Sequence, residues 1–329
     1  MERKQLEDIL DSMEKSKILV LGDMGLDIYW NADMRLSRLA RENPYHYVPI
    51  TDEKITLGGG GNLTRCIATL SKQVSVISII GNDWKGREIL RLLDEEGVNT
   101  DGIIVSDEWN TVSYGKIRRR GVSDDVVYED PHLYFENYRD IPGKLEQEIL
   151  KRLKDITANF DYIFITDYQL HGVMNKNIRK AVSAYGQQGV DIVVDSRDYL
   201  TDYSYVTLKP NDVELFTALQ DKSENLNESI RQLYHKQNLK NICVTLGKKG
   251  AVCFDGSTLT EMPTKEIKGE TDTVGAGDAF GAAFTAALAG GSSLTAATNI
   301  GNLAAYVVVQ KIGTTGTASR KEILAVNEL

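Results

Sequence analysis

Residues 270–284 read Glu-Thr-Asp-Thr-Val-Gly-Ala-Gly-Asp-Ala-Phe-Gly-Ala-Ala-Phe, and this stretch decides the fold. Its Gly-Ala-Gly segment (275–277) lets the backbone turn tightly, with N–H groups exposed, into an apolar helix that we expect to end near Gly290. Converging N–H groups and the positive end of a helix dipole make such a turn an anion site. Asp278 stands at the helix start, where a carboxylate serves either as a helix cap or as a general base for a hydroxyl that attacks the anion.

Short apolar runs alternate with amphipathic patterns through most of the chain. Strands are predicted at 17–21, 74–80, 162–165, 191–194, 206–208 and 241–245. Helices are predicted at 2–14, 62–70, 85–96, 144–157, 175–187, 212–219 and 229–237. Because near-continuous apolar strands alternate with helices, we expect an α/β fold whose central, mostly parallel sheet is flanked by helices.

Two regions, 28–57 and 109–136, break this alternation because they are rich in Tyr, Val and charge and lack helical periodicity. Segments 111–117 and 124–128 resemble a β-hairpin that turns at 120–123. No Pro/Gly/Ser-rich linker divides the chain. We therefore expect a single domain over residues 1–329, with both regions forming a small β lid.

The composition restricts the classes of partner. Of the 329 residues, 42% are hydrophobic and 26% charged, and 47 acidic against 38 basic side chains give a net charge of −9. This is ordinary globular composition, and its acidity disfavours nucleic-acid binding. Three cysteines without CxxC spacing fit a reducing compartment. The charged N-terminus lacks the apolar core of a signal peptide, and no apolar run is long enough to cross a membrane, so we expect a cytoplasmic protein with no membrane partner.

Residues 272–285 resemble the second signature of the ribokinase-like (PfkB) family of sugar and nucleoside kinases. The glycine run at 58–61, followed by Asn62, resembles the family's first signature. This resemblance covers essentially the whole chain and implies a ribokinase-like fold and an ATP-dependent sugar kinase. A non-catalytic ligand-binding regulator on the same scaffold is the remote alternative, which the intact Asp278 disfavours.

The resemblance also implies roles for individual residues. Asp278 would be the catalytic base, with charge developing on the phosphoryl group held by the backbone of Gly275, Ala276 and Gly277. Sugar-binding groups would be Asp23, Asp27, Gly59, Gly60 and Asn62. The ATP side would include Asn211, Glu214, Thr245, Gly247, Gly250 and Asn302, with Asn211 and Glu214 placing Mg²⁺ partly through water. Asp272 and the carbonyl of Val274 are candidate ligands of a monovalent cation such as K⁺. Taken alone, Asn211 and Glu214 also fit an ordinary helix cap, and 245–250 fits a plain β-turn.

Within the family, the sequence most resembles the bacterial D-glycero-β-D-manno-heptose-7-phosphate kinases, in the segments 22–27, 37–44 and 299–317. A phosphorylated acceptor needs cationic ligands, and Arg38 and Arg118 are the candidates in the lid. The run of three arginines at 118–120 equally fits a solvated strand edge. Departures from the subfamily at 40–43 and 195–197 fall in or near the sugar pocket. An unphosphorylated ketohexose, pentose or sugar acid is therefore the alternative acceptor.

Two expectations concern assembly. The bifunctional members of that subfamily carry an added nucleotidyltransferase domain, for which this chain has no room, so we expect the kinase activity alone. The lid carries Tyr45, Tyr47, Tyr114 and Tyr128, whose rings pack within the lid, on the sugar or against a second copy. Because related kinases often pair through the lid, the resemblance favours a homodimer.

Overall fold

The computed structural model describes residues 1–121, 126–156, 159–221, 225–313 and 315–328. Its main sheet has nine strands in the order β14-β13-β12-β11-β10-β9-β1-β4-β5. Their bounds are β1 (Lys17–Gly22), β4 (Gln73–Gly81), β5 (Asn99–Ser106), β9 (Tyr162–Asp167), β10 (Ile192–Ser196), β11 (Thr207–Leu208), β12 (Asn241–Thr245), β13 (Ala251–Phe254) and β14 (Leu259–Met262). Only the pairs β12–β13 and β13–β14 are antiparallel. The predicted central, mostly parallel sheet is confirmed.

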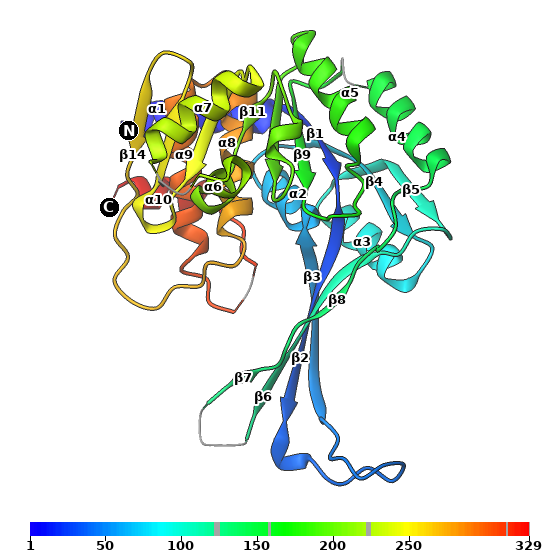
Figure 1. The fold of residues 1–329 in the computed structure, drawn as a ribbon. Helices are drawn as coiled ribbons and strands as arrows, with labels where there is room; N and C mark the ends of the chain where they lie inside the picture. The colour runs from blue at the N-terminus through cyan, green and yellow to red at the C-terminus, as the bar shows by residue number, and fades with distance from the viewer. Residues whose placement is uncertain (122–125, 157–158, 222–224, 314, 329) are drawn as a thin grey trace.

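Helices cover both faces of this sheet because its central strands are apolar on both sides (Figure 1). Ile18 and Val20 of β1 pack against one group of helices, and Leu19 and Leu21 against the other. The first group is α1 (Arg3–Lys15), α2 (Gly60–Ala68), α3 (Trp84–Glu95), α8 (Ala276–Ala289), α9 (Leu294–Val308) and α10 (Arg320–Asn327). The second is α4 (Gly143–Ile156), α5 (Lys176–Gln187), α6 (Asp212–Leu219) and α7 (Leu226–Gln237). Across the described residues, no helix combines the length and apolarity that a membrane crossing requires.

The predicted strands and helices are confirmed to within about three residues at their ends. Three strands of the main sheet, β5, β13 and β14, are absent from the predicted runs. The edge strands β5 and β14 consist mostly of exposed and part-buried residues, so they lack the continuous apolar run that marks the central strands. β13 is fully buried but only four residues long. For the predicted helix at 144–157, residue 157 lies outside the described residues.

A second sheet extends away from the body in Figure 1, and we call it the lid sheet. Its strands run β3-β2-β6-β7, with β8 also paired to β6. Their bounds are β2 (Met24–Asp33), β3 (Ile50–Gly59), β6 (Val112–Arg120), β7 (Tyr128–Glu129) and β8 (Leu133–Phe135). The chain passes from β1 to β2 through Asp23 alone, so Asp27 lies inside a lid strand. Of the predicted hairpin, residues 122–125 lie outside the described part of the chain.

The strand order places the site. β1 pairs with β4 on one side and with β9 on the other, so the order reverses at β1. In open parallel sheets, ligands bind beyond the carboxyl ends of the strands at such a reversal. Here those ends lead into Asp23, Tyr168 and Arg197, after β1, β9 and β10.

Candidate active site

Asp278 is held by Asn62 rather than by its own helix. Gly275 caps α8 with a left-handed backbone (φ 81°) and no side-chain cap. The Nδ2 group of Asn62, in α2, donates to Oδ2 of Asp278 at 2.6 Å. Arg65 in turn donates to Oδ1 of Asn62 at 2.8 Å, which fixes the orientation of the amide. Of the two roles open to Asp278, this geometry favours the general base over the helix cap.

The surroundings of Asp278 give it the acidity of a base that works near neutral pH. Desolvation raises the pKa of Asp278 to about 6. The hydrogen bond from Asn62 opposes that rise because it stabilises the carboxylate, and Asp195 adds to the rise by like-charge repulsion. A carboxylate with this pKa is ionised at pH 7 and still basic enough to accept a hydroxyl proton.

Asp23 requires a correction. The sequence predicts it as a sugar ligand, but its carboxylate accepts backbone N–H groups of Tyr168 and Gln169 at 3.1 Å each and of Val173 at 2.7 Å. Burial, and then repulsion from Asp167, raise the pKa of Asp23 to about 7. We therefore assign Asp23 to the loop after β9, where it positions Tyr168 and Gln169 at the pocket.

The lid sheet contributes a carboxylate, that of Asp27, to the candidate site. Its side chain lies between Thr56 of β3 and Tyr114 of β6, its register partners. Although the residue is 8% exposed, no donor among the described residues hydrogen-bonds to its carboxylate. Burial raises the pKa of Asp27, and the positive charge of Lys116 opposes that rise. An unpartnered carboxylate of this kind can accept hydrogen bonds from sugar hydroxyls.

The glycine run shapes the wall between the two sheets. Gly59 starts α2 with φ 53°, and a Cβ there would lie 3.6 Å from the ring of Tyr168. A Cβ on Gly60 would lie 2.3 Å from the carbonyl oxygen of Asp23, which no side chain tolerates. The run therefore lets the start of α2 approach Asp23 and brings Asn62 to Asp278.

A buried cation lies among the site's carboxylates. Lys209 donates to Asp195 at 2.9 Å, and each residue is nearly inaccessible. Tyr168 donates its hydroxyl to the same carboxylate at 3.0 Å. Burial acts to lower the pKa of Lys209, but Asp195, Glu214 and Asp278 together raise it, so the ammonium stays charged. Lys209 therefore supplies positive charge close to Asp195, Glu214 and Asp278.

Asn211 and Glu214 form the capping box of α6, with both hydrogen bonds at 2.8 Å. The helix-cap alternative thus describes their mutual contacts, while one carboxylate oxygen of Glu214 is left over. Burial and the neighbouring Asp195 raise the pKa of Glu214, so a cation here would be stabilising. Within the described ranges, no three His, Cys, Asp or Glu side chains cluster as a metal site. Few protein ligands suit Mg²⁺, which keeps waters and binds phosphates.

The predicted nucleotide residues are spread over one side of the body. Thr245 donates its backbone N–H to Pro210 at 3.0 Å, so the end of β12 lies beside the start of α6. Gly247 has φ 55° and open space at its Cβ position, whereas a Cβ on Gly250 would meet the carbonyl oxygen of Met262 at 2.1 Å. Both glycines therefore serve a tight turn.

Two further predicted residues are occupied by internal contacts. Asn302 donates its side-chain amide to the carbonyl of Met262 at 2.8 Å, so it joins α9 to β14 rather than presenting its amide to a ligand. The carboxylate of Asp272 accepts the N–H groups of Val274 at 3.0 Å and Gly313 at 2.9 Å. Asp272 thereby ties the Gly-Ala-Gly turn to the loop after α9.

The two arginines predicted to bind phosphate, Arg38 and Arg118, lie in different places. Arg118 faces the body, since its guanidinium lies 3.7 Å from the Cβ position of Gly313, but Glu129 already pairs with it at 3.2 Å. Arg38 lies far from the candidate active site of its own chain. β2 carries the backbone about 20 Å from Asp27 to the strand end, and Arg38 lies beyond it, bonded to the hydroxyl of Tyr47.

Several pocket residues are missed by the motifs. They are Arg65, Tyr114, Lys116, Gln169, Arg197 and Lys209. Lys209 directly follows the predicted strand at 206–208, and Arg197 lies three residues after the predicted strand at 191–194, so their place near the carboxyl ends of parallel strands was the available signal. Tyr114 lies on a lid strand and accepts a hydrogen bond from Gln169; contact with the sugar is one of the three roles that the sequence leaves open for its ring.

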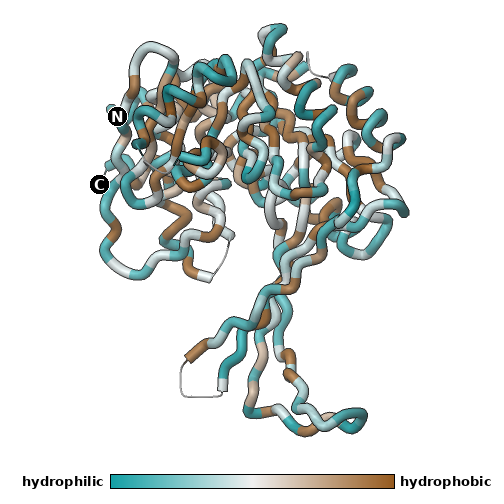
Figure 2. The backbone as a smooth tube through the Cα atoms, viewed as in Figure 1, coloured by the Kyte–Doolittle hydropathy of each residue, from teal (hydrophilic) through white to brown (hydrophobic). Residues whose placement is uncertain are grey.

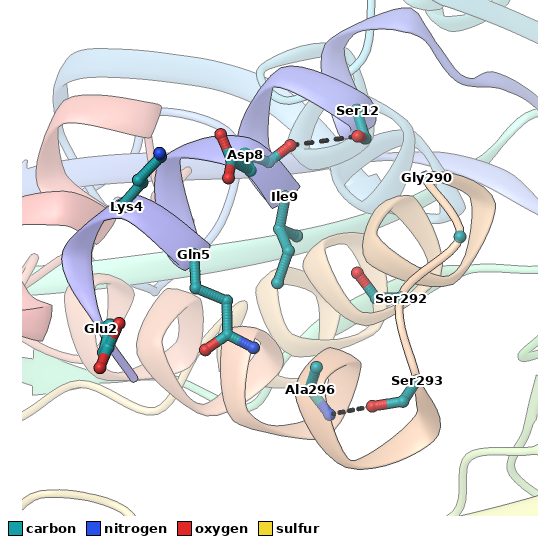
Figure 3. Close-up of a pocket in the computed structure, with 11 residues that line it drawn as sticks. Glu2, Lys4, Gln5, Asp8, Ile9, Ser12, Gly290, Ser292, Ser293 and Ala296 are labelled. Carbon is teal, nitrogen blue, oxygen red and sulfur yellow. Dashed lines mark hydrogen bonds between the residues drawn. The ribbon is translucent and has the colours of Figure 1, made fainter.

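A separate surface hollow of about 480 Å³ lies between α1 and the turn after α8 (Figure 3). Its lining includes Asp8, Ser12 and Gly290. The length of α8, at 1.5 Å per residue, separates this hollow from Asp278 by about 20 Å. It is therefore not part of the candidate active site.

An α/β sheet with a lid, a carboxylate at a helix N-terminus and a buried lysine among carboxylates together fit a small-molecule phosphotransferase. Residues 16–321 match the model of the pfkB family carbohydrate kinases, so the chain belongs to that family and is a sugar kinase. It is 32% identical, over 93% of its length, to the bifunctional protein HldE of Sulfurimonas denitrificans, and 31% identical, over 99%, to that of Citrifermentans bemidjiense. It covers 63% and 66% of these two proteins, which is less than two thirds of either.

Solved structures show the same fold. Ribokinase of Arabidopsis thaliana, complexed with ribose and ATP, aligns with a TM-score of 0.70 at 21% identity, over 96% of this chain and 99% of that one. Phosphofructokinase-2 of Escherichia coli, in complex with fructose-6-phosphate, aligns with a TM-score of 0.74 at 18% identity, over 95% and 98%. These likenesses confirm the ribokinase-like architecture.

Proposed function

We propose that this protein transfers the γ-phosphoryl group of ATP to a hydroxyl of a sugar that already carries a phosphate, with a heptose 7-phosphate as the first candidate. The observation that carries the phosphotransfer is the 2.6 Å contact between Asn62 and Asp278 at the start of α8. The similarity to HldE over nearly the whole chain supports a heptose phosphate as acceptor.

In the proposed mechanism, Asp278 accepts the proton of the acceptor hydroxyl as its oxygen attacks the γ-phosphorus of ATP in line. The bond from that phosphorus to the β–γ bridging oxygen breaks, and ADP leaves. Backbone N–H groups of the Gly-Ala-Gly turn stabilise the charge that develops on the phosphoryl oxygens. Asp27 orients the sugar by accepting hydrogen bonds from its hydroxyls. Glu214 and Asn211 would hold Mg²⁺, which neutralises phosphate charge when bound.

A panel of acceptors tests this proposal. ADP release is measured with Mg-ATP, in KCl and in NaCl, for heptose 7-phosphate, fructose 6-phosphate and unphosphorylated hexoses, pentoses and sugar acids. We expect turnover with the heptose phosphate at a kcat/KM at least about tenfold above the unphosphorylated sugars. Potassium should raise the rate if Asp272 and the Val274 carbonyl bind it. Preference for an unphosphorylated sugar would instead support the alternative acceptor, and no turnover with any sugar would overturn the proposal.

We further propose a homodimer that forms through the lid. Hydrophobic residues recur along the lid as well as in the body (Figure 2). Those exposed on the lid are Leu36, Leu39, Tyr45, Tyr47, Val48, Ile50, Tyr128, Leu133, Tyr134 and Phe135. Exposed apolar surface of this extent is typical of an interface, and a second copy of this chain is the occupant we propose.

Sedimentation velocity tests the dimer. We expect a dimer at micromolar concentration, and a Leu39→Asp/Tyr45→Asp variant should be monomeric because charges would be buried in the interface. Val105→Asp, an equally exposed apolar site on β5 of the body, is the matched control and should remain dimeric. A monomeric wild-type protein, or loss of the dimer in the control alone, would contradict an interface on the lid.

A further inference from the structure

Arg197 directly follows the carboxyl end of β10. Its backbone N–H donates to the carbonyl of Asp167 at 3.2 Å, which fixes the start of the loop to β9. Its guanidinium lies over the ring of Tyr168, with Cζ 5.1 Å from the ring centroid. The residue is nevertheless exposed, so its donors are accessible to a ligand.

Arg197 acts electrostatically on groups of both the lid sheet and the body. Its positive charge lowers the pKa of Asp27, on the lid sheet, and of Asp278, on α8. It also lies within electrostatic range of the hydroxyl of Tyr114. Its guanidinium therefore lies near both the sugar-binding carboxylate and the catalytic base.

Arg197 differs from the other arginines near the site in that no group of the described residues bonds to its guanidinium. Arg118 pairs with Glu129 at 3.2 Å, Arg179 pairs with Asp167 at 2.9 Å, and Arg65 donates to the amide of Asn62. Within the ranges that the structure describes, the Arg197 side chain makes no hydrogen bond and no ion pair. A guanidinium presents five N–H donors in a planar fork that matches phosphate and carboxylate oxygens.

We propose that Arg197 is the specificity-determining residue that binds the anionic group already present on the acceptor sugar, a phosphate in the case of a sugar phosphate. This proposal rests on the proposed sugar-kinase function. Arg197 would take the place in which the sequence suggested Arg38 and Arg118. With the anionic group on Arg197 and a hydroxyl on Asp27, a second hydroxyl can reach Asp278.

The test compares Arg197→Gln with wild type on two acceptors, a sugar phosphate and the same sugar without its phosphate, at pH 8. Loss of the Arg197 charge raises the pKa of Asp278, but at pH 8 Asp278 stays ionised. The difference between the two acceptors therefore does not reflect protonation of Asp278. Arg197→Lys keeps the charge but loses the fork. Arg87→Gln, an exposed arginine on α3, is the matched control.

We expect Arg197→Gln to raise KM for the sugar phosphate about 10- to 100-fold and to change KM for the unphosphorylated sugar and for ATP less than about threefold. Arg197→Lys should fall between, and Arg87→Gln should match wild type. Equal changes for both acceptors, or a selective change in KM for ATP, would overturn the role of Arg197. Failure of the sugar-kinase proposal can be distinguished from failure of the Arg197 proposal, because in the first case the wild-type enzyme would turn over neither acceptor.

Discussion

Replacement of Asp278 by Asn is expected to lower kcat by about 10²- to 10⁴-fold and to leave the affinity for ATP nearly unchanged. The amide keeps the size of the carboxylate but cannot accept the hydroxyl proton, and general-base catalysis usually contributes a factor of this size. The residual rate would come from the orientation and charge stabilisation that the turn and the floor of the site still provide. Initial rates with saturating acceptor, and ATP binding by calorimetry, measure the two effects.

The pH dependence of the same enzyme checks the assignment. Asp278 must be deprotonated to act, so wild-type kcat/KM should fall as the pH drops below about 6, the pKa to which its burial raises it. The Asn variant should lose this acidic limb from its residual activity. Asp94→Asn, on the exposed side of α3, is the control and should keep both rate and limb. An Asp278→Asn enzyme with near-normal turnover would exclude Asp278 as the base.

Replacement of Lys209 by Met is expected to reduce the free energy of unfolding by about 3–5 kcal/mol. The substitution leaves Asp195 as an uncompensated buried charge, which is the costly way to break a buried ion pair. Activity at pH 6 should fall as well, because the loss of Lys209 removes a charge that lowers the pKa of Asp278. Urea denaturation and the pH–rate profile measure these two effects.

The chain offers a matched control for this effect. Lys240, just before β12, pairs with Asp191, just before β10. The side chain of Lys240 is 51% exposed. Because exposed ion pairs contribute little, Lys240→Met should cost less than about 1 kcal/mol. The double variant Asp195→Asn/Lys209→Met should regain part of the lost stability, since it removes both charges. Equal losses for the two lysines would show that burial does not govern the Lys209 pair.

The fold and the proposed phosphotransfer site can be predicted from the sequence because both depend on local patterns. The apolar runs of β1 and β9 predict buried strands. The turn at 275–277 and Asp278 are adjacent in the sequence, so one short motif contains them. The structural role of Asp23 could not be predicted in this way. Its three donors lie 145 to 150 residues further along the chain, and only the tertiary fold brings the loop after β9 to its carboxylate.

The arginines show a second limit of sequence reasoning. A pattern suggests that Arg38 and Arg118 belong to the acceptor site, but it contains neither the length of β2 nor the presence of Glu129 opposite Arg118. Arg197 stands where the sequence departs from its relatives' pattern, at 195–197. Its exposure and lack of an anionic partner appear only when the ends of β9 and β10 are placed side by side.

The division of the molecule into two sheets bears on how such enzymes diversify. Asp27, which we propose as a sugar ligand, lies on a lid strand with Tyr114 and Lys116, whereas Asp278 and Glu214, the proposed base and Mg²⁺ ligand, belong to helices of the body. Mutations in the lid can therefore accumulate under selection for a new acceptor while the machinery for phosphoryl transfer is inherited unchanged. A lineage built in this way can explore different sugars without passing through inactive ancestors.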